Sequence, residues 1–468
     1  MKPLNVFALS RMIASILAIQ LAGCAGDGGG GDEVGGGDPP PPKPALITDL
    51  PPALVPGAAV IKFRSAGNEW AALTERLRAI EDLTAPDRQL LTATAGTRAL
   101  TTIDAPAGWS LIDFAMHPSG EITLVLASDH ELRLQRRAAD GAMIGDSIFG
   151  DPQAATDPFI GDARTIPDPQ SLVPQGTRDA VRVSPVGEDL LLAMRTGRNA
   201  VVAQWLTHVA GGTFTRRWRT LVEPGVAIDR VRLISGSFDP FGSLDTQWHL
   251  ALDVDAQGRS AIAVSLTHTE LPAGHREYFH EPLDPALISG AIITILDSTG
   301  LRLGATPIDI QVPSEIHALR WAGDTVLVAG RMLTTRRDDG GGWDGFLAHL
   351  KYGDPMAQLQ VLDFDRGDVI FDIAAFDDGR VGIVGSTAYL QNPTGGSISE
   401  NADLLLAILP VAGAPAERLW LPGYLGHNQL RTIAEWRGNL LIGGMQNGPG
   451  THSADTDPAL LTCNGFLR

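Results

Sequence analysis

The runs DTVLVAG (residues 324–330), GRVGIVG (379–385) and GNLLIGG (438–444) decide the fold of this chain. Each begins at a turn-forming residue and continues as a short apolar run rich in small and β-branched side chains. Three similar runs stand earlier, at residues 120–126, 188–194 and 258–264. Runs of this length and composition, entered from Gly, Asp or Asn, predict buried strands that follow tight turns.

Each of these six runs has further strand-like segments around it. The preceding candidates are residues 109–115, 179–184, 247–253, 315–320, 369–375 and 430–435. The following ones begin at residues 129, 199, 290, 345, 403 and 464. Weaker, more polar candidates come last in the unit, at residues 214–221, 305–310, 357–363 and 417–421. Four strands per unit, repeated about six times at intervals of roughly 55 to 70 residues, predict an all-β fold, a β-propeller of about six four-stranded blades.

The phrase DGFLA at residues 344–348, with its counterpart DLLLA at 403–407, resembles the degenerate repeats of bacterial β-propellers. The resemblance implies a propeller domain over residues 97–468 and implies no particular activity. Regularly spaced short strands also fit a pair of β-sandwiches or a solenoid, which stay open as alternatives. The last unit is one strand short, and we expect residues 97–103 to complete it and close the ring.

Residues 55–96 do not follow the repeat. The run AAVIKF (58–63) predicts a strand. A helical spacing follows it, in Trp70, Leu73, Leu77, Ile80 and Leu83. These patterns predict a small strand–helix segment that packs beside the ring as a cap or spacer.

The first 23 residues have the composition of an export signal, with Lys2 and Arg11 ahead of a short apolar stretch. LAGC at residues 21–24 resembles the lipobox of bacterial lipoproteins, which implies cleavage before Cys24 and lipid, including palmitate, on its thiol. Ala25 in place of Asp implies sorting to the outer membrane in a Gram-negative source, with periplasmic or surface display open. The alternative is an ordinary secretory signal with an incidental cysteine.

Residues 24–54 are rich in Gly, Asp and Pro and have little apolar surface to bury, so we expect a disordered tether. The net charge of −18 argues against nucleic acid as a partner, because a phosphate backbone would be repelled. Cys463 is the only other cysteine, so a lipidated Cys24 leaves no intramolecular disulfide. We interpret Cys463 as a buried small apolar residue, with a reactive thiol as the alternative.

The predicted connections differ in length according to their place in the blade. First-to-second and third-to-fourth strand turns are compact, whereas the second-to-third connections at 266–289, 331–343, 386–401 and 445–462 are long. So are the fourth-to-first connections at 146–178 and 222–246. In a meander both long kinds leave from one face, which we predict to be the binding surface; unconstrained drift of loop length is the alternative.

Candidate residues on that face are aromatic or histidine side chains. They are Phe238, Phe241, His268, His275, Tyr278, Phe279, His280 and Trp343. The aromatic residues could form platforms for a glycan or peptide, or anchor their loops. The three histidines could bind a metal together with nearby glutamates. Their spacing matches no standard ligand motif, so we favour a solvated polar loop as their explanation.

No nucleophile elbow, zincin motif, phosphate-binding loop or dinucleotide fingerprint occurs in the chain. We therefore assign no catalytic residue and no cofactor, and expect a membrane-tethered binding or scaffold lipoprotein of the cell envelope. Its partners would be the membrane, through Cys24, and an envelope protein or glycan. The alternative is a propeller-type hydrolase or lyase that acts on envelope polysaccharide or peptide and uses residues at the channel mouth.

Overall fold

A computed structural model of the chain describes its strands and part of the connections between them. The described residues are 55–56, 58–76, 88–94, 101–128, 132–148, 181–195, 201–223, 250–267, 289–308, 310, 314–334, 343–364, 367–376, 378–387, 403–410, 417–419, 428–436, 439–447 and 463–467. Every regular element among them is a β-strand. The predicted signal peptide, Cys24 and the predicted tether lie outside these residues.

The strands form seven four-stranded antiparallel sheets, each of which is one blade. From the innermost strand outward, blade 1 is β2 (Ala58–Ala66), β3 (Glu69–Arg76), β4 (Arg88–Thr94) and β5 (Thr101–Asp104); blade 2 is β6 (Ser110–Met116), β7 (Ile122–Ala127), β8 (Leu132–Arg137) and β9 (Met143–Ile148); and blade 3 is β10 (Val181–Val186), β11 (Asp189–Arg195), β12 (Val201–Val209) and β13 (Thr213–Glu223).

The same order continues through the rest of the chain. Blade 4 is β14 (Leu250–Val254), β15 (Ser260–Thr267), β16 (Ser289–Leu296) and β17 (Arg302–Ile308); blade 5 is β18 (Ser314–Ala322), β19 (Thr325–Leu333), β20 (Trp343–Lys351) and β21 (Gln358–Leu362); blade 6 is β22 (Val369–Ala375), β23 (Val381–Thr387), β24 (Asp403–Leu409) and β25 (Glu417–Leu419); and blade 7 is β26 (Gln429–Trp436), β27 (Asn439–Asn447), β28 (Cys463–Leu467) and β1 (Val55–Pro56).

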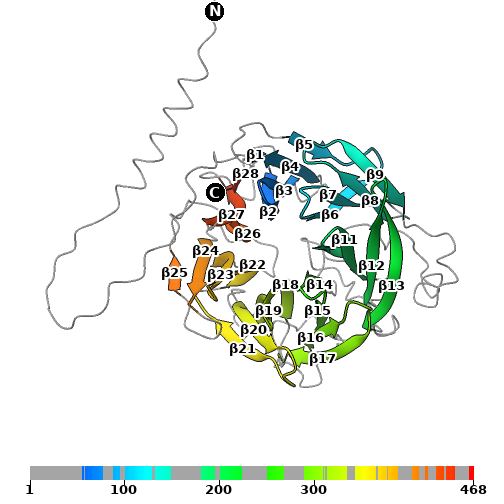
Figure 1. Ribbon diagram of the computed structural model, residues 1–468. Helices are drawn as coiled ribbons and strands as arrows, with labels where there is room; N and C mark the ends of the chain where they lie inside the picture. The colour runs from blue at the N-terminus through cyan, green and yellow to red at the C-terminus, as the bar shows by residue number, and fades with distance from the viewer. Residues whose placement is uncertain are drawn as a thin grey trace, which may run out of the picture. The chain divides into compact units, whose positions relative to one another are not determined.

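The innermost strands contact one another in sequence around a closed ring, from β2 through β6, β10, β14, β18, β22 and β26 back to β2. Figure 1 shows these strands around the centre, with the more polar outer strands at the rim. The predicted β-propeller is therefore confirmed. The number of blades is seven, because residues 58–104 build a complete blade of their own.

The helix predicted within residues 55–96 is wrong at its first positions. Trp70 and Leu73 lie in strand β3, where Ala71 and Ala72 between them are buried as well. A strand that is covered on both faces is a continuous apolar run, so the spacing of its large residues says nothing about helical periodicity. Leu77, Ile80 and Leu83 lie outside the described residues.

The prediction that an N-terminal strand completes the last blade is confirmed, but the segment predicted for it is wrong. Residues 101–104 form β5, which pairs with β4 in blade 1. The last blade is instead completed by β1, whose Val55 lies opposite Gly465 of β28. Cys463 lies in β28 opposite Asn447, and its side chain is outside the described residues.

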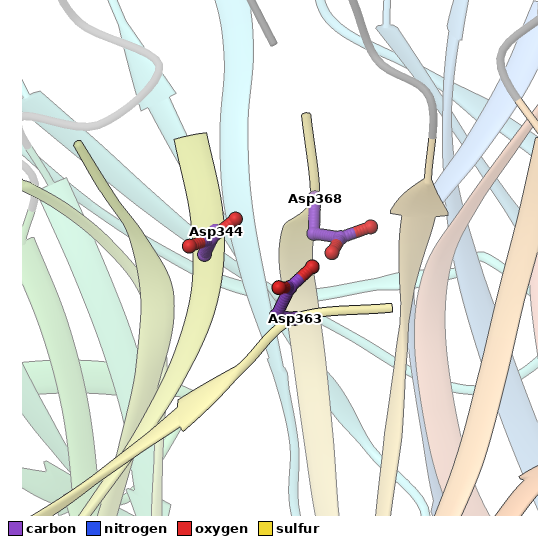
Figure 2. Close-up of side chains that lie close together, drawn as sticks. All are labelled: Asp344, Asp363 and Asp368. Carbon is purple, nitrogen blue, oxygen red and sulfur yellow. The ribbon is translucent and has the colours of Figure 1, made fainter. Parts of the chain in front are cut away.

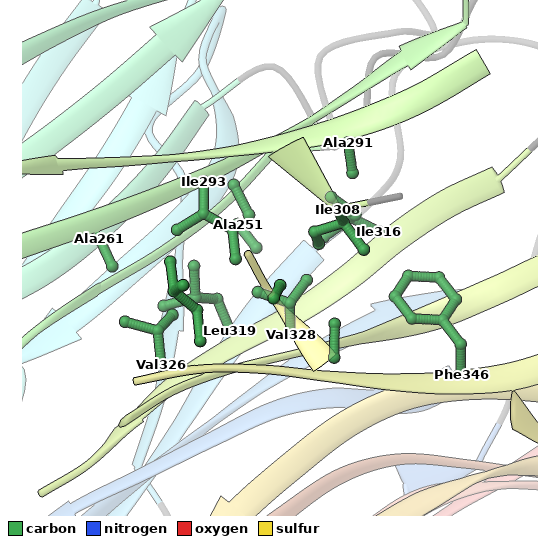
Figure 3. Packing of buried hydrophobic residues seen from close by; sticks show 14 of the residues in the cluster. Ala251, Ala261, Ala291, Ile293, Ile308, Ile316, Leu319, Val326, Val328 and Phe346 are labelled. Atoms are coloured by element: carbon green, nitrogen blue, oxygen red, sulfur yellow. The ribbon is translucent and has the colours of Figure 1, made fainter. Parts of the chain in front are cut away.

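Blades pack face to face through continuous apolar layers. Between blades 4 and 5, Ile293, Val326, Val328 and Phe346 are fully buried in one such layer (Figure 3). The sequence therefore shows unbroken apolar runs in the middle strands, where an open sheet would show alternation. No helix among the described residues has the length and apolar character needed to cross a membrane.

Candidate functional site

The two faces of the ring receive different connections. The turns after the innermost strands, such as Gly187–Glu188 and Gly323–Asp324, leave from one face, which we call the compact face. The second-to-third and fourth-to-first connections begin and end on the opposite, loop-rich face, because neighbouring strands are antiparallel. Residues 149–180, 224–249 and 268–288 connect strands on that face. The strand bounds thus place the ends of the longest connections where the sequence predicts them.

Seven of the eight predicted site residues fall in those connections and lie outside the described residues: Phe238, Phe241, His268, His275, Tyr278, Phe279 and His280. The eighth, Trp343, is the first residue of β20 and only 9 % exposed. The Arg331 guanidinium lies over its ring at 4.5 Å. Trp343 therefore matches the loop-anchor alternative better than a platform for a ligand.

Around Trp343, charged side chains at the loop-rich ends of blade 5 form hydrogen bonds and ion pairs with one another. Arg331 donates from Nε and Nη2 to the two carboxylate oxygens of Glu315, at 2.6 and 2.7 Å. The same carboxylate lies 3.5 Å from His317 Nε2. The paired geometry of a guanidinium and a carboxylate fixes both side chains, so this corner of the face is preorganised.

Next to this corner, Asp344, Asp363 and Asp368 bring one carboxylate oxygen each to within 4.8 Å of one another. Asp344 is the second residue of β20, Asp363 follows β21, and Asp368 precedes β22, so two blades contribute (Figure 2). Asp368 is buried, Asp344 is half-buried and Asp363 is exposed. The three form a small acidic cluster open on its Asp363 side.

Hydrogen bonds position two members of this cluster. Thr334 Oγ1 donates to Asp344 Oδ2, and the Phe364 backbone N–H donates to Asp368 Oδ2 at 2.6 Å. The Asp368 N–H donates to the Trp343 carbonyl at 2.7 Å, which joins the edge of blade 6 to blade 5. Carboxylate oxygens are ligands that Ca²⁺ and Mg²⁺ accept, so these are the described residues able to contribute to a cation site. They also hold the connection between β21 and β22.

Sequence reasoning did not select this cluster. In the sequence, Asp344 stands out only as the first residue of the strand phrase DGFLA, and Asp363 and Asp368 lie in a short connection. Their spacing follows no metal-binding motif. They come together only because β20 pairs with β21 and β22 of the next blade packs against β20.

Backbone irregularities shape the loop-rich ends of the innermost strands. Register shifts leave one extra residue in β2, β6, β18, β22 and β26, and in the last three that residue is His317, Phe371 or Arg431. The Arg431 guanidinium lies 3.9 Å from the Phe371 ring centroid, and the His317 ring lies 5.4 Å from it. The bulges therefore gather a cationic and aromatic row from three neighbouring blades.

In β18, β22 and β26 the bulge lies opposite a glycine of the facing strand, where a side chain would collide with the bulged backbone. A Cβ at Gly330, Gly385 or Gly444 would lie 1.8, 1.8 or 2.0 Å from a carbonyl oxygen of the bulged strand. These glycines end the three runs that decide the fold, so the signal for the bulges is present in the sequence. A strand interior otherwise disfavours glycine.

A histidine–hydroxyl pair is present on the compact face, but it is buried from solvent. His117 Nε2 lies 2.7 Å from Thr123 Oγ1, and both residues are fully buried. The His117 Nδ1–H group donates to the Gly187 carbonyl at 3.0 Å. Burial lowers the pKa of His117 to about 4, so the ring is neutral at neutral pH. This pair joins two blades and offers no accessible nucleophile.

Comparison with known proteins gives fold similarity only. No protein-family model matches the chain, and no curated protein is recognisably similar to it. It is similar in structure to the β-propeller domain of the Trilobed protease from Pyrococcus furiosus, at 9 % identity and TM-score 0.42, over 88 % of this chain and 94 % of that one. It is also similar to the WD40 repeats of RRP9, at 10 % identity and TM-score 0.45, over 91 % and 99 %. YCF48 bound to a D1 peptide is similar at 9 % identity and TM-score 0.43, over 91 % and 97 %. Similarities at these levels carry no functional argument.

Proposed function

We propose that this protein is a lipid-anchored cell-envelope lipoprotein that binds another envelope protein or a polysaccharide through the loop-rich face of its propeller. The observation that carries the proposal is the segregation of connections, since the longest ones begin and end on one face of a rigid ring. Long loops on a rigid scaffold are the usual place for binding residues.

The described part of the loop-rich face supports this proposal chemically. It combines the acidic cluster of Asp344, Asp363 and Asp368 with the bulge row of His317, Phe371 and Arg431. Arginine and aromatic rings are enriched at binding interfaces, and carboxylates accept hydrogen bonds from a partner. No observation in the described strands favours the hydrolase or lyase alternative over binding.

The anchor and the binding surface need separate tests. Cys24→Ser removes the thiol that would carry lipid, so we expect the variant to leave the membrane fraction while keeping the Tm of the propeller. Membrane association of Cys24→Ser equal to that of the unchanged chain would contradict lipid anchoring, whatever the outcome for the binding surface.

For binding, the informative experiment is crosslinking pulldown from intact cells with two variants of the lipidated chain. One replaces residues 335–342, on the loop-rich face, by a short glycine-containing turn. The other changes the exposed compact-face residue Asp378 to Ala. We expect the first variant to lose a partner that the unchanged chain and Asp378→Ala both capture, and equal capture by all three would contradict a binding role for this connection.

A further inference from the structure

Acidic side chains of the innermost strands bind the backbone of the next blade around the ring axis. Asp113 accepts a hydrogen bond from the Val183 N–H, Asp253 from the Trp321 N–H, and Asp372 from the Ile433 N–H. The distances are 3.1, 2.9 and 3.2 Å. These carboxylates therefore have a structural role, because each joins two neighbouring innermost strands.

Two of the same carboxylates are also neutralised by cations from the preceding blade. Lys62 Nζ lies 2.5 Å from Asp113 Oδ1, and Arg320 Nη2 lies 2.9 Å from Asp372 Oδ1. The second oxygen of Asp372 accepts from Thr432 Oγ1 at 3.1 Å. The oxygen atoms of both carboxylates are thus already engaged by described groups.

Arg64 of β2 differs from these cations. Its Nη1 donates to the Phe63 carbonyl at 2.6 Å, and within the described residues it forms no ion pair. Its charge interacts with those of Arg320, Asp372, Asp113 and Asp253, which come from four other innermost strands. Since these strands surround the axis, the guanidinium lies near it.

Burial, and then the neighbouring Arg320, lower the pKa of Arg64 below its ordinary value, to about 10. The group therefore stays charged at neutral pH. A half-buried cation without a carboxylate partner is costly, and most of the five donors of a guanidinium are left for another acceptor.

Strand register places small residues at the level of Arg64 in three other innermost strands. Arg64 is the third residue after the bulge of β2, and Arg320 occupies the same place in β18. The corresponding residues of β6, β22 and β26 are Ala115, Ala374 and Ala434. Two arginines thus share one level of the axis with three alanines, in the half of each strand that leads to the compact face.

We propose that Arg64, supported by the charge of Arg320, binds a small oxyanion, a carboxylate or a phosphate, at the ring axis on the side of the compact face. A guanidinium offers two parallel N–H groups that match the two oxygens of such an anion. Binding would bring a negative charge into direct contact with Arg64, which interacts with Asp113, Asp253 and Asp372 without an ion pair among the described residues. This site is separate from the loop-rich face and does not depend on the proposed function.

The test uses the folded chain and two probes, inorganic phosphate and acetate, each titrated at constant ionic strength with sodium chloride as the balancing salt. We expect Tm to rise in a saturable way with at least one probe, and the probe that acts identifies the chemical class. Arg64→Gln should weaken the apparent affinity roughly tenfold or more, because a charge-assisted hydrogen bond is lost. Arg64→Lys keeps the positive charge but lacks the two parallel N–H groups of a guanidinium. Its apparent affinity should lie between those of the unchanged chain and Arg64→Gln.

Arg380→Gln is the matched control, because Arg380 lies on the compact face and is exposed in an ion pair with Asp378. It should respond to the anion as the unchanged chain does. Without added anion, Arg64→Gln should melt at the same temperature as the unchanged chain or higher. A response of Arg64→Gln equal to that of the unchanged chain, no saturable response to either probe, or a large loss of Tm in Arg64→Gln would each overturn the proposal.

Discussion

The compact and loop-rich faces of this propeller differ in the interactions that shape them. On the compact face, side chains reach across turns and between blades: Arg136 bonds to Glu121 and Glu188, and His117 bonds to Gly187. On the loop-rich face, the strand ends are shaped by backbone bulges opposite glycine, and the connections beyond them vary in length. The difference teaches that turn side chains join neighbouring blades on the compact face, whereas the loop-rich face differs from blade to blade in its backbone and in the length of its connections.

The largest effect should come from filling the space opposite a bulge. In Gly385→Ala the new Cβ would lie 1.8 Å from the Val369 carbonyl oxygen, so the backbone of β22 or β23 must move. We expect a loss of about 4 kcal/mol in the free energy of unfolding, measured by chemical denaturation.

Gly304→Ala provides the control, because a Cβ at this strand glycine meets nothing within 4 Å. It should change stability by less than about 0.5 kcal/mol. Similar small effects at both positions would show that the bulged ends are not rigid.

The next largest effect tests the compact face. Arg136 is 1 % exposed, lies 2.5 Å from Glu121, also pairs with Glu188, and donates to the Glu188 carbonyl at 2.9 Å. Arg136→Met removes the pair with Glu121 within blade 2 and the bonds to Glu188 of blade 3, and we expect a loss of about 3 kcal/mol in denaturant unfolding. Arg380→Met, at an exposed ion pair, should cost less than about 0.5 kcal/mol; equal losses would mean that burial of Arg136 adds nothing.

The compact face should also be sensitive to acid at His117. Its pKa is about 4 in the folded chain against 6.5 for the ordinary value, so the unfolded chain takes up a proton first. The resulting stability is complete above pH 6.5 and is lost as pH falls toward 4, by about 2 to 3 kcal/mol. His117→Asn, measured over the same pH range, should give a flatter curve; an unchanged slope would assign the acid sensitivity to other groups.

The smallest effect is expected on the loop-rich face. Replacing residues 335–342 by a short turn leaves β19 and β20 intact, since these strands end at Leu333 and begin at Trp343. The free energy of unfolding should change by less than about 0.5 kcal/mol. A loss as large as that of Arg136→Met would mean that this connection belongs to the frame of the propeller.

Much of the fold could be predicted because blade strands are local patterns. Six of the seven blades were located from apolar runs and the turns before them, including the run at residues 379–385 that became β23. The blade of residues 58–104 was missed because Trp70 and Leu73 suggested a helix, and its strands do not carry the repeated phrases. Closure by β1 was missed because a strand of two residues has no detectable pattern.

The site was less predictable, for a physical reason. Asp344, Asp363 and Asp368 approach one another only through sheet pairing and blade order, and Arg64 meets Arg320 only across the ring. Sequence spacing contains none of these distances. The positions of three bulges are easier to predict from the sequence, because Gly330, Gly385 and Gly444 recur at one position of the repeat.

We propose that the loop-rich face binds the partner and that the compact face stabilises the ring. These roles of the two faces are tested most directly by placing a photocrosslinking amino acid at Asp363 or at Asp378. Both aspartates are exposed; Asp363 lies between blades 5 and 6 on the loop-rich face, and Asp378 lies in the β22–β23 turn on the compact face. In intact cells, the chain substituted at Asp363 should form a defined crosslinked product and the chain substituted at Asp378 should not. Equal products from both positions, or a product from Asp378 alone, would contradict the claim.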